Sequence, residues 1–204
     1  MALSWVDSRS AFADATQWFV STVALVGDRW ARPGLGEWDV RSLVGHTSRS
    51  LLTVESYLAR PAAAVEVASA ADYVRAGRAV AAAAEVAARG RDAGSALGAD
   101  PTAAVAEIAA RVVPLVDARQ GTELMTTIAG GMRLSDYLPT RTFELVVHTA
   151  DLASALDLPG DVPATSAAEA LALVAELVVA DGAAGLLLLA VTGRSGLPAG
   201  FSVL

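Results

Sequence analysis

One stretch of the sequence gathers five polar side chains at helical spacing. Tyr137, Arg141, Glu144, His148 and Asp151 follow one another at intervals of four, three, four and three positions. On an α-helix all five fall within one narrow ribbon, and apolar residues flank it on both sides. The ribbon is either the solvated face of an amphipathic helix, steadied by pairs worth about 0.2–0.5 kcal/mol each, or a row of groups facing a binding site.

Glu144 and His148 have the residue types and the spacing to bind a cation. An i, i+4 pair on a helix places its Cβ atoms about 5–6 Å apart, so the two side chains can converge. The chain has one other histidine, His46. On the wheel of its own predicted helix, His46 lies on a polar strip beside the apolar stripe, at the flank of a cleft between helices. That strip also holds Ser50, Thr53 and Tyr57.

A lone histidine beside an apolar stripe is more often a satisfied core residue than a ligand. Together with Glu144 and His148, however, His46 would complete a three-donor site with a vacant position, the pattern of catalytic metal. Zinc suits these donors best, and nickel, iron(II) or cobalt would also accept them. Asp151, one turn beyond His148, either orients the imidazole of that histidine or faces water.

Two segments carry a resemblance to a known family. They are GLGEWDVRSLVGH (34–46) and RTFELVVHTADL (141–152). Both resemble the mycothiol-dependent maleylpyruvate isomerase family within the DinB-like metalloprotein superfamily, and residues 192–201 are similar to its shorter members. The resemblance implies a DinB-like four-helix bundle in which His46, Glu144 and His148 ligate a divalent metal, usually zinc. It also implies mycothiol as a cosubstrate.

The segment after His148 departs from the isomerase itself, which has a larger C-terminal domain with arginines near its active site. Here Arg194 is the only arginine beyond His148, so we expect a dicarboxylate to lack obvious partners and maleylpyruvate not to be the substrate. The broader implication is a metal-dependent thiol transferase or isomerase acting on a small-molecule thiol and a small electrophile. Arg141 or Tyr137 is expected to steer an anionic group.

The composition removes several classes of chemistry. The chain contains no cysteine, and all 15 of its basic residues are arginine, so disulfides, thiolate zinc sites, cysteine nucleophiles and Schiff-base lysines are excluded. Any reacting sulfur must arrive with a cosubstrate. The net charge of -7 argues against nucleic acid as a partner. Three alternatives to a thiol enzyme stay open: a non-catalytic metal or small-ligand binding protein, an interaction domain without metal, and a metal enzyme that uses water.

Neither a secretory signal nor a membrane span is expected. The N-terminus lacks a basic flank followed by an apolar core. The most apolar stretch, 171–193, is interrupted by Glu176 and Asp181, whereas a spanning helix needs about 20 apolar residues. We therefore expect a cytoplasmic protein without membrane partners. Its leucine-rich terminal segments are compatible with a homodimer.

Apolar periodicity predicts an all-α or strongly α-dominated protein. The first helix is expected to start near Asp7 or Ser8, the second to be capped by Asp39, and the fourth by Asp100 with proline at its first position. The predicted helices span 7–30, 40–59, 69–89, 101–119, 135–156 and 166–179. Residues 90–98 are expected to form a loop and 122–133 an irregular connection, while the apolar segment ending at Val191 fits helix or strand.

These elements predict a four-helix bundle with a small C-terminal addition. The expected division is a metal-binding bundle over residues 1–158 and a short helical or extended segment over 159–204 packed on it. Trp18, Trp30 and Trp38 are expected in the core or a pocket wall. The glycines at 34 and 36 lack the third glycine of a dinucleotide fingerprint, so we interpret them as a turn.

Overall fold

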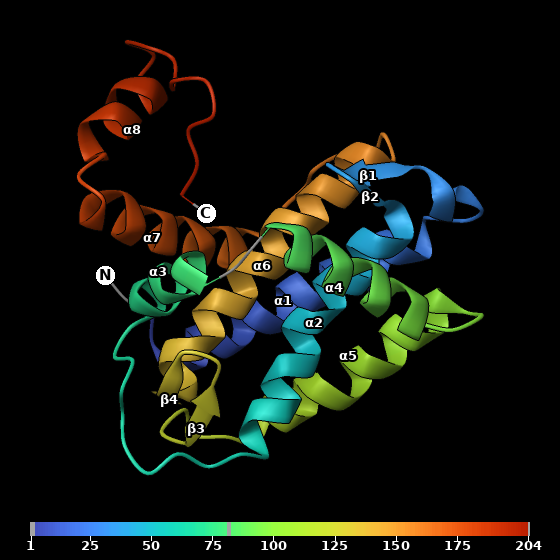
Figure 1. The fold of residues 1–204 in the computed structure, drawn as a ribbon, viewed down its shortest axis with the longest axis horizontal. Coiled ribbons are helices and arrows are strands. Elements are labelled where there is room, and N and C mark those ends of the chain that lie inside the picture. Colours follow the sequence, from blue (N-terminus) through green and yellow to red (C-terminus); the bar gives the residue numbers. More distant parts are fainter. Residues whose placement is uncertain (1–2, 81–82, 204) are drawn as a thin grey trace.

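The computed structural model in Figure 1 describes residues 3–80 and 83–203. Within these residues α-helices dominate, as the sequence predicts, beside two small antiparallel hairpins. The helices are α1 (Trp5–Ala24), the 3-10 helix η1 (Arg29–Ala31), α2 (Val40–Leu58), α3 (Ala70–Val80), α4 (Ala83–Ala96), α5 (Pro101–Asp117), α6 (Leu134–Ala155), α7 (Ala164–Ala180) and α8 (Ala184–Val191). The strands are β1 (Pro33–Leu35), β2 (Trp38–Asp39), β3 (Leu124–Thr127) and β4 (Gly130–Arg133).

Four long helices form the bundle around which the rest of the chain is arranged. Helices α1 and α2 each contact both α5 and α6, which closes a ring of four. The interior is filled by large side chains with no solvent exposure, each contributing about 1.5–3 kcal/mol through burial. They include Phe12, Phe19, Leu43, Leu51, Leu138 and Leu145.

Side-chain caps explain where three of these helices begin. The carboxylate of Asp39 accepts a hydrogen bond from the backbone of Ser42 at 2.7 Å, and Asp100 caps α5 in the same way with Pro101 at the first helical position. Both caps were predicted and are confirmed. Helix α1 starts earlier than predicted because Ser4 is its cap, accepting from the amide of Asp7.

The predicted first helix is too long at its C-terminal end. Helix α1 stops at Ala24, Gly27 follows with a φ of 62°, and η1 covers Trp30 separately. The apolar spacing continues because Val26 and Trp30 still pack on the core, but the backbone turns at Gly27. The apolar spacing in the sequence therefore extends beyond the end of the helix.

The predicted loop at 90–98 is wrong, because most of it belongs to α4. Helix α4 lies against α2 at a glycine-to-glycine crossing, where a Cβ on Gly45 would come within 2.1 Å of the backbone nitrogen of Gly94. These glycines permit close helix packing rather than chain reversal. The predicted helix 69–89 is represented by α3 and the first part of α4, and its residues 81 and 82 lie outside the described residues.

Two further segments differ from prediction. The connection predicted as irregular at 122–133 contains a hairpin in which Leu124 pairs with Arg133 and Thr127 with Gly130. Helix α6 begins at Leu134, one residue before the predicted start. The apolar segment ending at Val191 is helical, as α8. The turn predicted at Gly34 and Gly36 forms the β1–β2 hairpin.

The C-terminal helices are packed unequally. Helix α7 contacts both α1 and α6, whereas none of the residues of α8 is buried. Figure 1 shows α8 beyond the end of α7, away from the bundle. No helix among the described residues has the length and apolarity needed to cross a membrane.

Candidate metal centre

The packing of α2 against α6 brings the three predicted donors together. His46 comes from α2, and Glu144 and His148 come from α6. One potential ligand atom from each lies within 4.8 Å of the other two. Oε2 of Glu144 is 3.2 Å from Nε2 of His148 and 3.9 Å from Nε2 of His46. Residues almost a hundred positions apart therefore face one point.

This arrangement fits a divalent cation. Nitrogen and oxygen ligands about 2.0–2.2 Å from a tetrahedral ion are separated from one another by roughly 3.3–3.5 Å. The spacings of 3.2 and 3.9 Å between the glutamate oxygen and the two imidazole nitrogens are close to that range. Two imidazoles and one carboxylate leave a coordination position for a substrate, as in catalytic zinc sites.

The imidazole of His46 is positioned by an aromatic neighbour. The indole of Trp38 lies over it with ring centroids 4.4 Å apart and an interplanar angle of 32°. Trp38 is itself fixed, because its Nε1 donates a hydrogen bond to the carbonyl of Ala87 at 3.0 Å. Gly90 leaves the space that the indole fills, since a Cβ there would come within 2.5 Å of the ring. The expectation for Trp38 as a pocket wall is confirmed.

The imidazole of His148 is held by Asp151. Oδ2 of Asp151 lies 3.1 Å from Nδ1 of His148, which leaves Nε2 directed at Glu144. A carboxylate on the far nitrogen fixes the tautomer and the ring orientation of a histidine ligand. Of the two roles left open for Asp151, the geometry favours the orienting one.

The three donors have unequal proton affinities. Burial, aided by His148, lowers the pKa of His46 to about 4 despite the opposing charge of Glu144. Burial would raise the pKa of Glu144, but the hydrogen bond from His148 and the charge of Arg141 lower it to about 2. At neutral pH the first is therefore a neutral imidazole and the second a carboxylate, the forms that bind metals.

His148 behaves differently from His46. Burial would lower its pKa, but the hydrogen bonds and charges of Asp151 and Glu144 raise it to about 9. The imidazolium ring therefore lies between two carboxylates, and its Nε2 proton points toward Glu144, where a cation would sit. A divalent cation bound by Nε2 would displace this proton.

Arg141 and Tyr137 are placed one behind the other. The guanidinium of Arg141 lies 4.9 Å from the ring centroid of Tyr137, and its charge is one cause of the lowered pKa of Glu144. Arg141 borders the cavity described below. Tyr137 is fully buried, and its hydroxyl donates to Oγ1 of Thr53 at 2.9 Å. Tyr137 thus supports Arg141 from behind, and the structure does not place it at the cavity surface.

The donors open onto a cavity of about 1130 Å³. The predicted polar strip of α2 faces it, since His46, Ser50, Thr53 and Tyr57 all line its wall. The interpretation of the α6 ribbon as a solvated face is wrong, because Tyr137 is 0% and His148 only 9% exposed. The polar groups of α6 face an internal site.

Sequence reasoning missed the cationic lining of this cavity. Four arginines border it: Arg49, Arg78, Arg89 and Arg141. The sequence singles out only Arg141 among them, and the expectation that a dicarboxylate lacks obvious partners rests on the segment after His148 alone. The other three arginines come from α2, α3 and α4 rather than from the segment after His148. The position of Arg49, one turn beyond His46, was a signal that could have revealed it.

The fold and the site together define a helical-bundle protein with a potential metal-binding triad shared by two helices. A model of the family described as the mycothiol maleylpyruvate isomerase N-terminal domain matches residues 12–153, well over half of the chain. The protein belongs to this family, and the resemblance seen in the two motifs is confirmed. No curated protein and no solved structure matched the chain. The matched segment contains all three donors, whereas α7 and α8 lie beyond it.

Proposed function

We propose that this protein is a divalent-metal-dependent enzyme that activates a low-molecular-weight thiol, mycothiol, for transfer to or isomerisation of a small electrophile. The observation that carries the proposal is the convergence of His46, Glu144 and His148 on a large cavity. Zinc is the metal proposed, with nickel, iron(II) and cobalt as the other candidates. When bound, such a cation supplies a Lewis acid that lowers the pKa of a nearby thiol.

The size of the cavity supports a reaction between two molecules. Cavities that hold one drug-sized ligand measure about 300–1,000 Å³, and this one measures about 1130 Å³. The chain has no cysteine, so a thiol reaction here requires a sulfur-bearing cosubstrate as well as an electrophile. The cavity offers room for both.

The residues around the donors have separate tasks in this proposal. Asp151 orients the ring of His148, and Trp38 restrains the ring of His46. Arg141 supplies a fixed positive charge beside Glu144 and steers an anionic group of a substrate. Because the surroundings of Arg141 are buried, it attracts an anion more strongly than an arginine in water does. The apolar helices behind the site exclude bulk water from the reacting groups.

The decisive experiment combines elemental analysis with a thiol assay. Protein purified without a polyhistidine tag is expected to contain one divalent metal per chain and to conjugate mycothiol to small electrophiles. His148→Ala and Glu144→Gln are expected to lose the metal and the activity. Glu176→Gln makes the same chemical change at an exposed position of α7 and is expected to change neither.

Other outcomes would replace the proposal. Equal turnover by wild type and His148→Ala would end it. Stoichiometric metal without turnover of any thiol would instead identify a metal or small-ligand binding protein. Metal-free protein whose melting temperature is unchanged by a chelator would remove both interpretations, because bound metal stabilises the folded state.

A further inference from the structure

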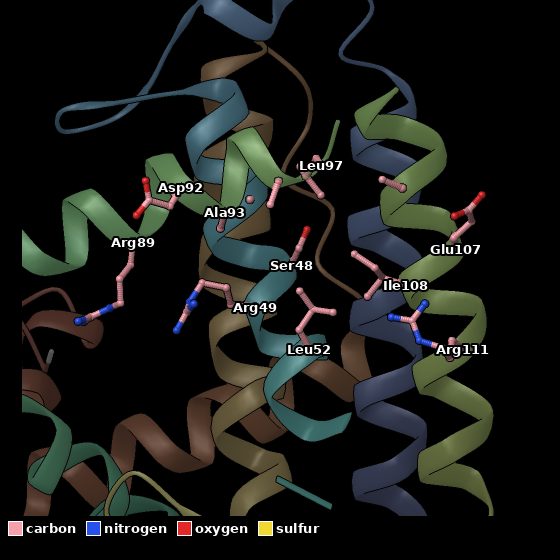
Figure 2. Close-up of a pocket in the computed structure, with 13 residues that line it drawn as sticks. Ser48, Arg49, Leu52, Arg89, Asp92, Ala93, Leu97, Glu107, Ile108 and Arg111 are labelled. Carbon is pink, nitrogen blue, oxygen red and sulfur yellow. The ribbon is translucent and has the colours of Figure 1, made fainter. Parts of the chain in front are cut away.

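Two cavities meet at a pair of arginines. The metal-site cavity is one, and a second cavity of about 500 Å³ lies between α2, α4 and α5. We call the second cavity the outer groove (Figure 2). Arg49 and Arg89 line both. In Figure 2 their guanidinium groups extend to the same side, away from Leu52 and Ile108.

Arg49 differs from the other arginines of the metal-site cavity. The other three are engaged: Arg78 with Asp181 at 2.7 Å, Arg89 with Glu85 at 3.6 Å, and Arg141 over the ring of Tyr137. The guanidinium of Arg49 forms neither an ion pair nor a hydrogen bond with any residue that the structure describes. It is half-buried and stands one helical turn from His46.

An unpaired guanidinium at this position favours an anionic ligand. Partial burial removes some of its water, and no protein carboxylate replaces that water. A guanidinium presents a planar fork of donors that matches a carboxylate, and such charge-assisted pairs are stronger than neutral hydrogen bonds. The chain as a whole is acidic, with a net charge of -7, so the positive charge here is a local feature.

The outer groove supplies an apolar surface next to Arg49. Side chains of Leu52, Leu97 and Ile108 line it together with several alanines, and its charged residues Asp92, Glu107 and Arg111 lie among them. Arg111 is already paired, because both oxygens of Glu55 accept hydrogen bonds from it at 2.6 and 3.1 Å. The groove therefore suits a hydrocarbon chain whose polar end lies at Arg49.

We propose that Arg49 binds the carboxylate of a substrate whose apolar chain occupies the outer groove. This assignment rests on the proposed function only in treating the metal-site cavity as the reaction chamber. It restricts the possible electrophilic substrates to carboxylates that carry an apolar chain. Arg49 would then hold the carboxylate where the two cavities meet, and Arg141, which lines only the metal-site cavity, would lie nearer the metal donors.

The test measures binding without turnover, so its result is independent of thiol chemistry. Octanoate and 1-octanol are titrated calorimetrically into wild type, Arg49→Gln, Arg49→Lys and Arg133→Gln. Octanoate is expected to bind wild type and to weaken at least tenfold in Arg49→Gln, with Arg49→Lys intermediate. Arg133→Gln removes the same charge at an exposed position outside both cavities and is expected to stay within twofold of wild type. The binding of 1-octanol is expected to be weak and equal in all four.

Three results would overturn the assignment. Equal weakening by Arg49→Gln and Arg133→Gln would show a general charge effect. Binding of 1-octanol as tight as that of octanoate would remove the role of the carboxylate. The titrations are repeated after metal removal and dialysis: octanoate binding that disappears with the metal and ignores Arg49→Gln would place the carboxylate at the metal donors instead. Circular dichroism of each variant verifies its fold.

Discussion

Helices α6 and α8 show that local polarity does not decide burial. Helix α6 carries a ribbon of charged and polar side chains, yet it is packed against α1, α2, α3 and α7 with His148 only 9% exposed. Helix α8 has no charged residue, yet Leu188 is 62% and Val191 70% exposed. The difference arises because α6 is surrounded by other helices, whereas α8 extends beyond the end of α7 (Figure 1). Neighbouring helices therefore decide whether a helix is buried. In α6 that burial contributes to the pKa shifts of Glu144 and His148.

Truncation of one leucine in each region should give the largest contrast. Leu145→Ala removes a fully buried side chain from α6 and is expected to lower the free energy of unfolding by about 2–5 kcal/mol. Leu188→Ala on α8 is expected to change it by less than about 0.5 kcal/mol. Urea denaturation followed by circular dichroism measures both. A loss above about 2 kcal/mol for Leu188→Ala would show that α8 is covered in solution, as a homodimer would require.

Two glycines allow the same comparison between a packed helix and α8, this time through contacts of the backbone. Gly45→Ala places a methyl group against the backbone of Gly94, which cannot move aside, and is expected to destabilise the protein by about 1–3 kcal/mol. Gly185 on α8 has open space around it, so Gly185→Ala is expected to be neutral or to stabilise by up to about 1 kcal/mol. Differential scanning calorimetry gives the two melting temperatures. Equal shifts in one direction would contradict the close packing of α2 on α4.

Glu169 is a buried acidic residue of α7, and its substitution tests the packing of this helix on the bundle. Its side chain is buried, and neither carboxylate oxygen has a hydrogen bond of good geometry. Burial raises its pKa above the ordinary 4.5, and the hydroxyls of Ser8 and Thr142 oppose that shift. The charged form therefore disfavours folding, so stability is full below the unfolded pKa and declines as the pH rises toward the folded pKa.

Glu169→Gln is expected to stabilise the protein by about 1 kcal/mol at pH 7 and to have little effect at pH 4. Denaturation at the two pH values measures the difference. Glu176→Gln, at an exposed position of the same helix, is the control and should show no such pH dependence. The same gain at both pH values would mean that Glu169 does not titrate differently in the folded protein.

The smallest effect is expected where the C-terminal segment meets α3. Asp181 lies 2.7 Å from Arg78 and 3.5 Å from Arg75, and these partly exposed pairs are worth less than about 1 kcal/mol each. Asp181→Asn is expected to leave the melting temperature nearly unchanged but to speed proteolysis after α7.

Limited trypsin digestion with mass spectrometry measures that cleavage. Asp157→Asn breaks an exposed pair with Arg32 and should not alter it. An unchanged cleavage rate in Asp181→Asn would show that the ion pairs do not restrain the segment.

The spacing of residues within single helices predicted the metal donors and Asp151, but not most of the arginines of the cavity. The i, i+4 relation of Glu144 and His148 and the further turn to Asp151 needed only the helical repeat, and the polar strip around His46 came from the same rule. Apart from Arg49, one turn beyond His46, the rest of the cationic lining could not be predicted in this way. Arg49, Arg78 and Arg89 belong to three helices whose mutual placement depends on contacts such as that of Gly45 with Gly94.

Two of the errors in the predicted fold involve glycine. Gly90 and Gly94 suggested a loop, because glycine by itself signals chain flexibility. In the structure Gly90 makes room for Trp38, and Gly94 allows α4 to approach α2. The same residue type serves a turn at Gly27, where φ is 62°. Only the surrounding atoms distinguish these uses.

The order of residues along the chain determined the helical character, the caps at Asp39 and Asp100, the absence of a protein thiol and the types of donor available. These properties are local or compositional, and a single chain segment specifies each of them. The tertiary structure decided which polar groups lose water, how far each pKa moves, and where the arginines gather. Those properties depend on distances between segments, which come from the packing of all the helices together.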